Sequence, residues 1–360
     1  MNKRVPVFAL LLMAAGLALA EDPPQAPPPP AAAPQQGSNY FNPSISVIGD
    51  FLGVVGSNHT EEPPAASLRE LELGLQAVVD PYARADIFLS FSDLGVDVEE
   101  GYATFTSLPW GLLVKVGRMR ATFGKINTLH LHVLPWADEP LPLVNLLGGE
   151  EGWIGDGLSV AKLIPLPGDV FSEATLQIFN GDSGELFLVP PGRRGVAYNG
   201  HYRIFSDLTE ATNLDVGLSY GLGPNGLTET SKTRLSALDV TLRWKPLRTA
   251  TYRSAMVRGE YIGSRKDLVS GSASASGWLL SGEYQFAKRW LVGARYERSD
   301  QADDASLHDS GVAVPITFCP SEFSRLRGEL RRRSYGSGET ADELLLQLQF
   351  AIGSHGAHPF

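Results

Sequence analysis

One cysteine, Cys319, occurs among the 360 residues of the chain. A single cysteine excludes an intramolecular disulfide scaffold and a cysteine-based metal cluster. Basic residues are also few, because 30 Lys and Arg stand against 40 Asp and Glu and give a formal net charge of -10. Nucleic-acid phosphates select basic surfaces, so this charge balance argues against a nucleic-acid partner.

Long apolar runs are missing as well. Beyond residue 20 no run reaches the roughly 20 apolar residues that a membrane-spanning helix needs. The mean hydropathy of -0.06 is too low for a helical membrane protein. A globular protein in water and a membrane β-barrel both remain, because a barrel alternates apolar with polar residues and has the average hydropathy of a soluble protein.

The first twenty residues predict a secretory signal peptide. A basic start, Asn2-Lys3-Arg4, precedes an apolar stretch at 5–17 and a small-x-small cleavage site at 18–20. An uncleaved helical anchor is the less favoured alternative, because the apolar stretch is short. Residues 21–40 are rich in proline, which favours extended polyproline conformations. We interpret this segment as a periplasmic tether, with a ligand role for the prolines as the weaker alternative.

From residue 43 onward, apolar side chains recur at every second position, which indicates β-strands. In the last segment Leu344, Leu346 and Leu348 alternate with Leu345 and Gln347. The segments are roughly 9–12 residues long, the span of a tilted transmembrane strand. Seven short turns alternate with eight mostly longer, polar connections. The pattern predicts an all-β fold at 41–360, a transmembrane antiparallel barrel of about 16 strands in the outer membrane, surrounded by lipid and lipopolysaccharide.

Aromatic residues gather at the short turns. Amphipathic rings prefer the membrane interface, so an aromatic girdle is expected there. The chain ends in Phe360, and a terminal aromatic after an amphipathic last strand resembles the signal read by the barrel-assembly machinery. The aromatics at the short turns are Tyr82, Trp110, Phe171, Phe205, Trp244, Tyr252, Phe286, Trp290, Phe318 and Phe323.

The connection at 125–156, after the fifth strand, is by far the longest, and it is too apolar for free exposure to water. We expect it to fold into the lumen and narrow the channel, since long ordered loops are usually functional. Packing over the outer mouth or into a trimer interface are the alternatives. The candidate constriction residues are His130, His132, Trp136, Asp138 and Glu139.

Two stretches carry a resemblance to known families. VGRMRATFGKIN at 116–127, preceded by VEEGYATF at 98–105, resembles phosphate-selective-porin-like proteins. Residues 130–167 and the tail HGAHPF at 355–360 resemble a porin-like group named zinc-regulated, TonB-dependent outer-membrane receptors. TonB-dependent receptors have about 22 strands around a plug, and the pattern here gives neither. The resemblance therefore implies a passive pore and leaves its substrate open.

Charged residues on the inward parity are expected to line the lumen. Because acids are interleaved with arginines, we expect a general or mildly anion-preferring pore. The charges could equally do no more than solvate a wide lumen. Arg118 and Arg120 have the opposite parity to Lys115 and are expected near the outer rim. The candidate pore-lining residues are Lys115, Arg203, Arg243, Arg258, Glu260, Glu283, Arg295, Glu297, Arg325, Arg327 and Glu329.

Metal and catalytic sites are weakly indicated. His130 and His132 could share a strand face and chelate a metal, but two histidines without a third ligand at fixed spacing favour ordinary polar residues at a loop base. His201 and the pair His308-Asp309 lack a nucleophile motif. We therefore expect no metal, no cofactor and no enzymatic activity.

These observations favour an outer-membrane porin that passes small hydrophilic solutes or ions by diffusion, with a homotrimer expected by analogy. A substrate-specific channel, for phosphate or a metal-related solute, is one alternative. An occluded barrel that anchors a partner is the other.

Overall fold

The computed structural model describes residues 43–353, except 93–94, 169, 185 and 190–193. The chain divides into two units, Met1–Tyr40 and Phe41–Phe360. The expected signal peptide, the proline-rich segment and the terminal Phe360 lie outside the described residues. Within the described part, no helix has the length and apolar character needed to cross a membrane.

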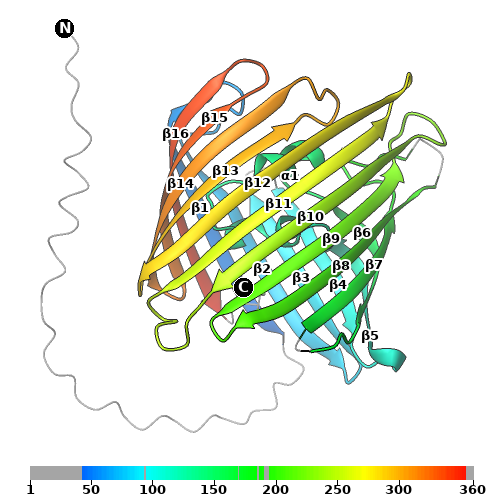
Figure 1. Ribbon diagram of the computed structural model, residues 1–360, viewed down its shortest axis with the longest axis horizontal. Helices are drawn as coiled ribbons and strands as arrows, with labels where there is room; N and C mark the ends of the chain where they lie inside the picture. Colours follow the sequence, from blue (N-terminus) through cyan, green and yellow to red (C-terminus); the bar gives the residue numbers. More distant parts are fainter. Residues whose placement is uncertain (1–42, 93–94, 169, 185, 190–193, 354–360) are drawn as a thin grey trace, which may run out of the picture. The chain divides into compact units, whose positions relative to one another are not determined.

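Sixteen antiparallel strands of the second unit close into one barrel, in which β1 pairs with β16 (Figure 1). The predicted fold class and strand number are therefore confirmed. The strands are β1 (Ser44–Ser57), β2 (Ala66–Asp80), β3 (Ala83–Ser92), β4 (Gly95–Phe105), β5 (Leu112–Arg120), β6 (Ile154–Leu163), β7 (Val170–Asn180), β8 (Val196–Thr209), β9 (Thr212–Pro224), β10 (Lys232–Trp244), β11 (Ser254–Asp267), β12 (Ser272–Ala287), β13 (Trp290–Asp300), β14 (His308–Ser321), β15 (Ser324–Ser334) and β16 (Thr340–Gly353).

Alternation along each strand decides which residues face out. On β16, Leu346 and Leu348 are exposed on the outer surface, whereas Gln347 and Gln349 are buried on the inner side. Closure is what makes such a sheet suitable for a bilayer, because lipid offers no hydrogen-bond partner to an open strand edge.

The two rims differ in their connections. Turns such as 81–82, 210–211 and 288–289 lie at one end, which we call the short-turn rim. The segments 58–65, 121–153 and 225–231 join the strands at the other end, the long-loop rim. Tyr82 and Trp110 are exposed at the short-turn rim, as a girdle requires. Phe205 is an exception to the predicted girdle, because its ring borders a cavity inside the barrel.

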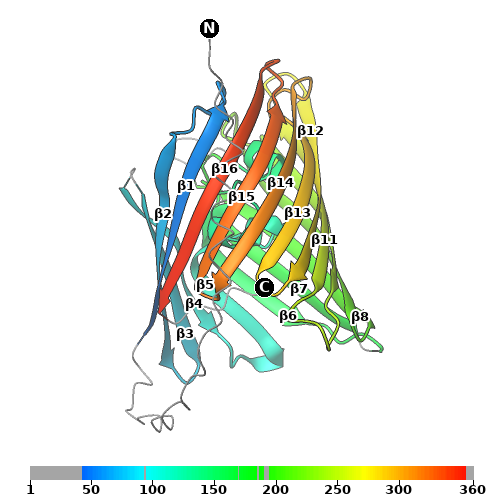
Figure 2. The ribbon, with the colours of Figure 1, turned by 90° about the vertical axis from the view of Figure 1, so that its left-hand side faces the viewer.

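The connection from β5 to β6, residues 121–153, lies inside the barrel (Figure 2). We call it the lumen loop. It contains the short 3-10 helices η4 (Ile126–Thr128) and η5 (Leu131–Val133) and the helix α1 (Leu141–Leu146). Helix α1 packs against β11, β12, β13 and β14.

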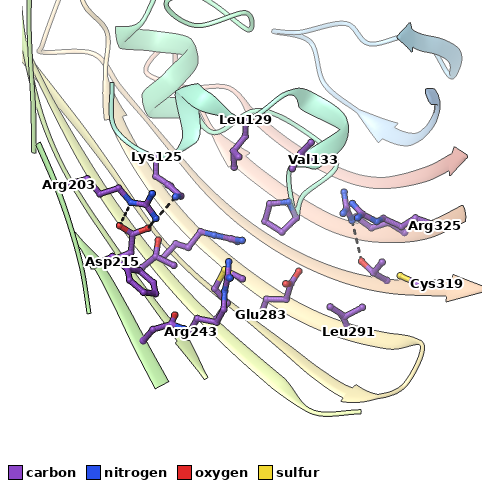
Figure 3. Close-up of a pocket in the computed structure, with 18 residues that line it drawn as sticks. Lys125, Leu129, Val133, Arg203, Asp215, Arg243, Glu283, Leu291, Cys319 and Arg325 are labelled. Carbon is purple, nitrogen blue, oxygen red and sulfur yellow. Dashed lines mark hydrogen bonds and ion pairs between the residues drawn. The ribbon is translucent and has the colours of Figure 1, made fainter. Parts of the chain in front are cut away.

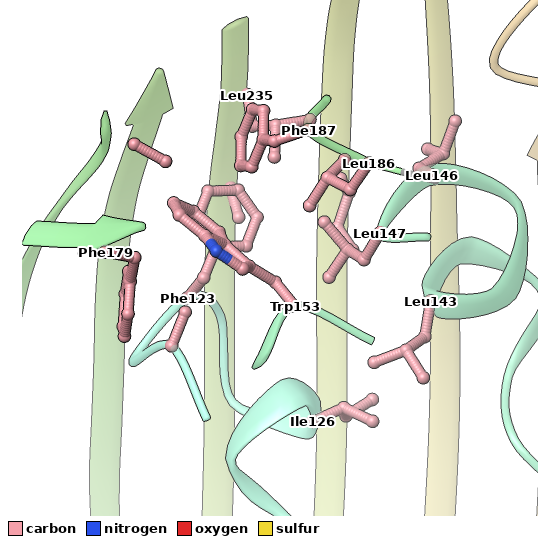
Figure 4. Close-up of a cluster of buried hydrophobic side chains, with 14 of the residues drawn as sticks. Phe123, Ile126, Leu143, Leu146, Leu147, Trp153, Phe179, Leu186, Phe187 and Leu235 are labelled. Carbon is pink, nitrogen blue, oxygen red and sulfur yellow. The ribbon is translucent and has the colours of Figure 1, made fainter. Parts of the chain in front are cut away.

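An apolar cluster fixes the two ends of the lumen loop to the wall (Figure 4). The Trp153 ring lies between Phe123 and Phe179, with ring centroids 5.7 Å away in both cases. Gly221 and Gly223 of β9 leave room for this packing, because a Cβ at Gly221 would approach Trp153 to 2.6 Å and one at Gly223 would overlap Phe187. The apolar character of the loop is thus explained by burial in the lumen.

Candidate functional site

The lumen loop is bound to the barrel wall through the Asp138 carboxylate. Arg295 of β13 donates to its Oδ1 at 2.8 Å, and Arg331 and Arg333 of β15 donate to its Oδ2 at 2.9 and 2.6 Å. All four side chains are buried. Burial alone would raise the pKa of Asp138, but the guanidinium groups of Arg295, Arg333 and Arg331 outweigh it and hold the pKa well below its usual value. The carboxylate therefore stays ionised and ties the loop to the wall.

Two further side chains of β15 bind the loop backbone. Arg327 donates to the carbonyl oxygens of Leu134 and Trp136, at 3.0 and 2.6 Å. Glu329 accepts a hydrogen bond from the N–H of Ala137 at 2.9 Å. These bonds satisfy backbone groups that would otherwise be buried without partners.

Carboxylates on other strands hold the starts of two loop helices. Glu260 of β11 accepts from the N–H groups of Lys125 and Ile126, both at 3.0 Å. Glu297 of β13 accepts from the N–H of Leu141, also at 3.0 Å. The first N–H groups of a helix lack partners within it, so the wall supplies them here.

The predicted pore-lining residues consequently form two groups. Four lie beneath the lumen loop and are at most 5% exposed: Glu260, Arg295, Glu297 and Glu329. Their side chains are on the inner side, but the prediction that they face open water is wrong for these four, because the loop covers them. The other seven border cavities in the lumen: Lys115, Arg203, Arg243, Arg258, Glu283, Arg325 and Arg327.

Two more residues of the predicted constriction lie against the wall. The Trp136 ring packs on Arg295, whose guanidinium carbon is 4.8 Å from the ring centroid. The backbone carbonyl of Glu139 accepts from Arg333 at 2.8 Å. Burial raises the pKa of the Glu139 carboxyl to about 7, although Arg69 opposes this change.

A basic cavity of about 360 Å³ lies between the lumen loop and the short-turn rim (Figure 3). Figure 3 shows Leu129 and Val133 of the loop on one side and Arg243 and Leu291 of the wall on the other. Its charged lining includes two acids, Asp215 and Glu283, and six bases, Lys125, Arg203, Arg243, Arg258, Arg325 and Arg327. Basic side chains therefore outnumber acidic ones in this lining by six to two.

One of these acids is already paired. Arg203 donates to Oδ1 of Asp215 at 2.7 Å, and Nζ of Lys125 lies 3.3 Å from Oδ2. Arg243 and Arg258 form no ion pair within 4 Å with another described residue. Both side chains line the cavity and contribute positive charge to it.

Arg120 lies between an inner and an outer cavity. It borders a cavity of about 430 Å³ on the short-turn side and another of about 190 Å³ on the long-loop side. Arg120 is the last residue of β5, at the long-loop end of the strand, and it lines the inner cavity together with Lys115 although the two have opposite parity. The chain turns into the lumen directly after Arg120, so the parity of the strand does not determine where this side chain points.

The predicted constriction histidines lie against carboxylates of β2 and β4. Nδ1 of His130 is 2.6 Å from Glu99 and 3.0 Å from Glu72, and Nε2 is 2.9 Å from Glu100. Burial lowers the pKa of His130, but Glu100, Glu72 and Glu99 outweigh it and hold the pKa well above its usual value. The His132 ring is also buried, with its centroid 5.6 Å from that of His130.

One contributor, Arg69, was missed because it is not found by period-two alternation. Arg69 lies at a shift in the β1–β2 register, and its side chain donates to Asp50 and to the carbonyl of Ala137. An extra residue at a β-bulge re-aims its side chain. Arg333, in contrast, has the parity of Arg331, so alternation alone could have found it.

No family model matches the chain. An uncharacterized protein of Aquifex aeolicus (strain VF5) is 29% identical to this chain in an alignment of 355 positions. The alignment covers 86% of this chain and 74% of that protein.

Solved outer-membrane porins and channels are similar in structure. The anion-selective porin from Comamonas acidovorans has a TM-score of 0.62 at 12% identity, over 87% of this chain and 100% of that one. OprB of Pseudomonas putida has a TM-score of 0.62 at 11% sequence identity, over 87% of this chain and 94% of that one. OmpT of Vibrio cholerae in its trimer form has a TM-score of 0.57 at 11% sequence identity, over 86% of this chain and 100% of that one. The chain therefore has the fold of the outer-membrane porins.

Proposed function

We propose that the protein is an outer-membrane porin that passes small hydrophilic solutes by diffusion, with a mild preference for anions. The observation that carries the proposal is the basic cavity under the lumen loop, with its six bases against two acids. Rings of positive side chains select anions in water-filled pores. The fold is also similar to that of an anion-selective porin, which agrees with the proposed preference for anions.

The proposed path runs past Arg120. A solute entering from the long-loop rim would reach the 190 Å³ cavity first, then Arg120, and then the larger inner cavity. Lys125 and Leu129 line both that inner cavity and the basic cavity, so the two adjoin. The pore we propose is passive and performs no catalysis. A specific solute, phosphate or a metal-related one, is not part of the proposal.

The proposed surroundings follow from the fold. The outer surface would contact lipid and lipopolysaccharide, with the longer loops outside the cell and the short turns in the periplasm. A homotrimer is proposed because OmpT of Vibrio cholerae was solved as a trimer. The signal peptide at 1–20, the tether at 21–40 and recognition of Phe360 by the assembly machinery complete the proposal.

A reversal-potential measurement in a planar bilayer under a salt gradient tests the selectivity. The wild-type protein should show a modest anion preference. The double variant Arg243→Gln/Arg258→Gln should lose it, whereas Arg332→Gln should not, because Arg332 lies on the exposed outer face of β15. A strong cation preference of the wild type would refute the anion part of the proposal.

The second candidate is an occluded barrel with an anchoring role. It is favoured by the dense bonding of the lumen loop to the wall around Asp138. An occluded barrel conducts no ions, so conductance separates the two functions.

A further inference from the structure

We propose that Glu70 and Glu72 of β2 and His132 of the lumen loop form a binding site for a divalent first-row transition-metal cation such as Zn²⁺. Each residue offers one ligand atom, and the three atoms all lie within 4.8 Å of one another. The sequence alone gave only two histidines without a third ligand. The fold supplies carboxylates from a strand that is about 60 residues away in sequence.

The spacing of the donor atoms is close to that of a metal site. Nδ1 of His132 is 3.6 Å from a carboxylate oxygen of Glu72 and 3.9 Å from one of Glu70. Two ligands that each bind a zinc ion at about 2.0–2.2 Å stand roughly 3–3.5 Å apart. The two distances from His132 are therefore within a few tenths of an ångström of this spacing, and the two glutamate oxygens lie within 4.8 Å of each other.

The chemistry of the donors selects the class of cation. Carboxylates alone suit Mg²⁺ and Ca²⁺, whereas an added imidazole favours zinc, iron, nickel and copper. One imidazole with two carboxylates is a mixed nitrogen and oxygen set, which leaves a fourth position for water. The site is therefore expected to prefer Zn²⁺ to Ca²⁺ and Mg²⁺.

The charges around the site favour a cation. Glu99 and Glu100 of β4 lie beside the two ligating glutamates, which makes four carboxylates in one largely buried region. His130 contacts these carboxylates through both of its ring nitrogens, and Arg120 lies 4.0 Å from Glu99. Carboxylate oxygens in a buried region need a compensating partner, and a divalent cation held by Glu70, Glu72 and His132 would supply one.

A neighbouring group of three donors shares Glu72 and consists otherwise of Glu99 and His130. The two nitrogens of His130 contact Glu99 at 2.6 Å and Glu100 at 2.9 Å. We assign His132 as the imidazole ligand, because its Nδ1 lies within 4 Å of both Glu70 and Glu72, and His130 as a neighbour that contacts the surrounding carboxylates.

Such an ion would join the lumen loop to β2. Asp138 already joins the loop to β13 and β15. The metal would add a second point of attachment, between His132 and the strand that carries Glu70 and Glu72. Its binding does not depend on the proposed porin function.

Isothermal titration of Zn²⁺ into the refolded, chelator-treated full chain in detergent tests the site. The wild type should bind one ion saturably, and both His132→Gln and Glu72→Gln should weaken binding at least tenfold. His201→Gln is the matched control, because His201 is a buried lumen histidine that contacts Ser219 at 2.8 Å in another part of the barrel. The absence of saturable binding to the wild type, or equal affinity of all variants, would overturn the proposal.

A second measurement needs no variant. Zinc-edge X-ray absorption of the loaded wild type should show imidazole together with oxygen ligands. A spectrum with oxygen ligands alone would overturn the assignment of His132. Ca²⁺ binding as tight as Zn²⁺ binding would overturn the class of cation.

Discussion

Asp138 and Arg295 are 157 positions apart in the sequence and are joined by a 2.8 Å hydrogen bond inside the barrel. Arg331 and Arg333 donate to the same carboxylate, so three buried guanidinium groups share one loop side chain. This arrangement holds the lumen loop against β13 and β15.

Asp138→Asn should release the loop. The substitution keeps the shape but leaves three buried arginines with less compensating charge, and breaking a buried ion pair costs about 3–5 kcal/mol. We expect a lower thermal unfolding temperature and larger, noisier channel openings. Asp342→Asn is the control, because Asp342 pairs with Arg332 at 3.6 Å on the exposed surface, where such pairs contribute about 0–1 kcal/mol. Equal effects of the two variants would contradict the anchoring role.

Acid should release the loop in the wild type. Burial raises the pKa of Glu61, but Arg333 and Arg331 outweigh it, so the pKa lies below its usual 4.5, as that of Asp138 lies well below its usual 3.8. A carboxyl with a lowered pKa stabilises the fold above its unfolded pKa and loses this contribution as the pH falls through its folded pKa.

The unfolding temperature and the conductance should be measured from pH 7 downward. Protonation of Glu61 and Asp138 should change them little until the pH falls below about 4. Asp138→Asn should remove a large part of the acid-induced change. An acid-induced change of the same size in that variant would show that other groups cause it.

Gly223→Ala should disturb the apolar cluster. An added Cβ would overlap the Phe187 ring, and inserting a methyl group into a packed core costs about 1–3 kcal/mol. The free energy of unfolding should fall by this amount. Gly282→Ala on β12 should have little effect, since a Cβ there meets no atom within 4 Å. Equal stability of both variants would mean that Phe187 moves aside.

Arg120→Ala should widen the passage between the inner and outer cavities. Arg120 borders both, and its guanidinium donates to the carbonyl of Glu151 at 2.6 Å. We expect larger single-channel conductance and a weaker anion preference. Arg118→Ala is the control, because Arg118 pairs with the exposed Asp156 at 3.9 Å and lines neither cavity. Unchanged conductance in Arg120→Ala would place the solute path elsewhere.

The barrel could be predicted from the sequence because alternation is a local property. Leu346 and Gln347 reveal their faces through their immediate neighbours, and the strand number follows from repeating that pattern. The apolar composition of the loop likewise predicted its burial in the lumen, since residues such as Leu134 and Leu147 must be shielded from water.

Which charged residues of the inner wall the lumen loop covers could not be predicted from alternation. Whether Glu329 faces water or the N–H of Ala137 depends on a contact between positions 192 residues apart. The carboxylates beside His132 depend on the pairing of β2 with its neighbours, and Arg69 depends on a bulge. Alternation gives the face of a residue but not what lies opposite it.

Single-channel recording of the refolded full chain in a planar bilayer with symmetric salt tests the central claim most directly. A passive porin with a loop-narrowed lumen should give ohmic openings that grow in Asp138→Asn and in Arg120→Ala. A folded, heat-modifiable barrel without any openings, in the wild type and in both variants, would contradict the porin function and favour the occluded barrel.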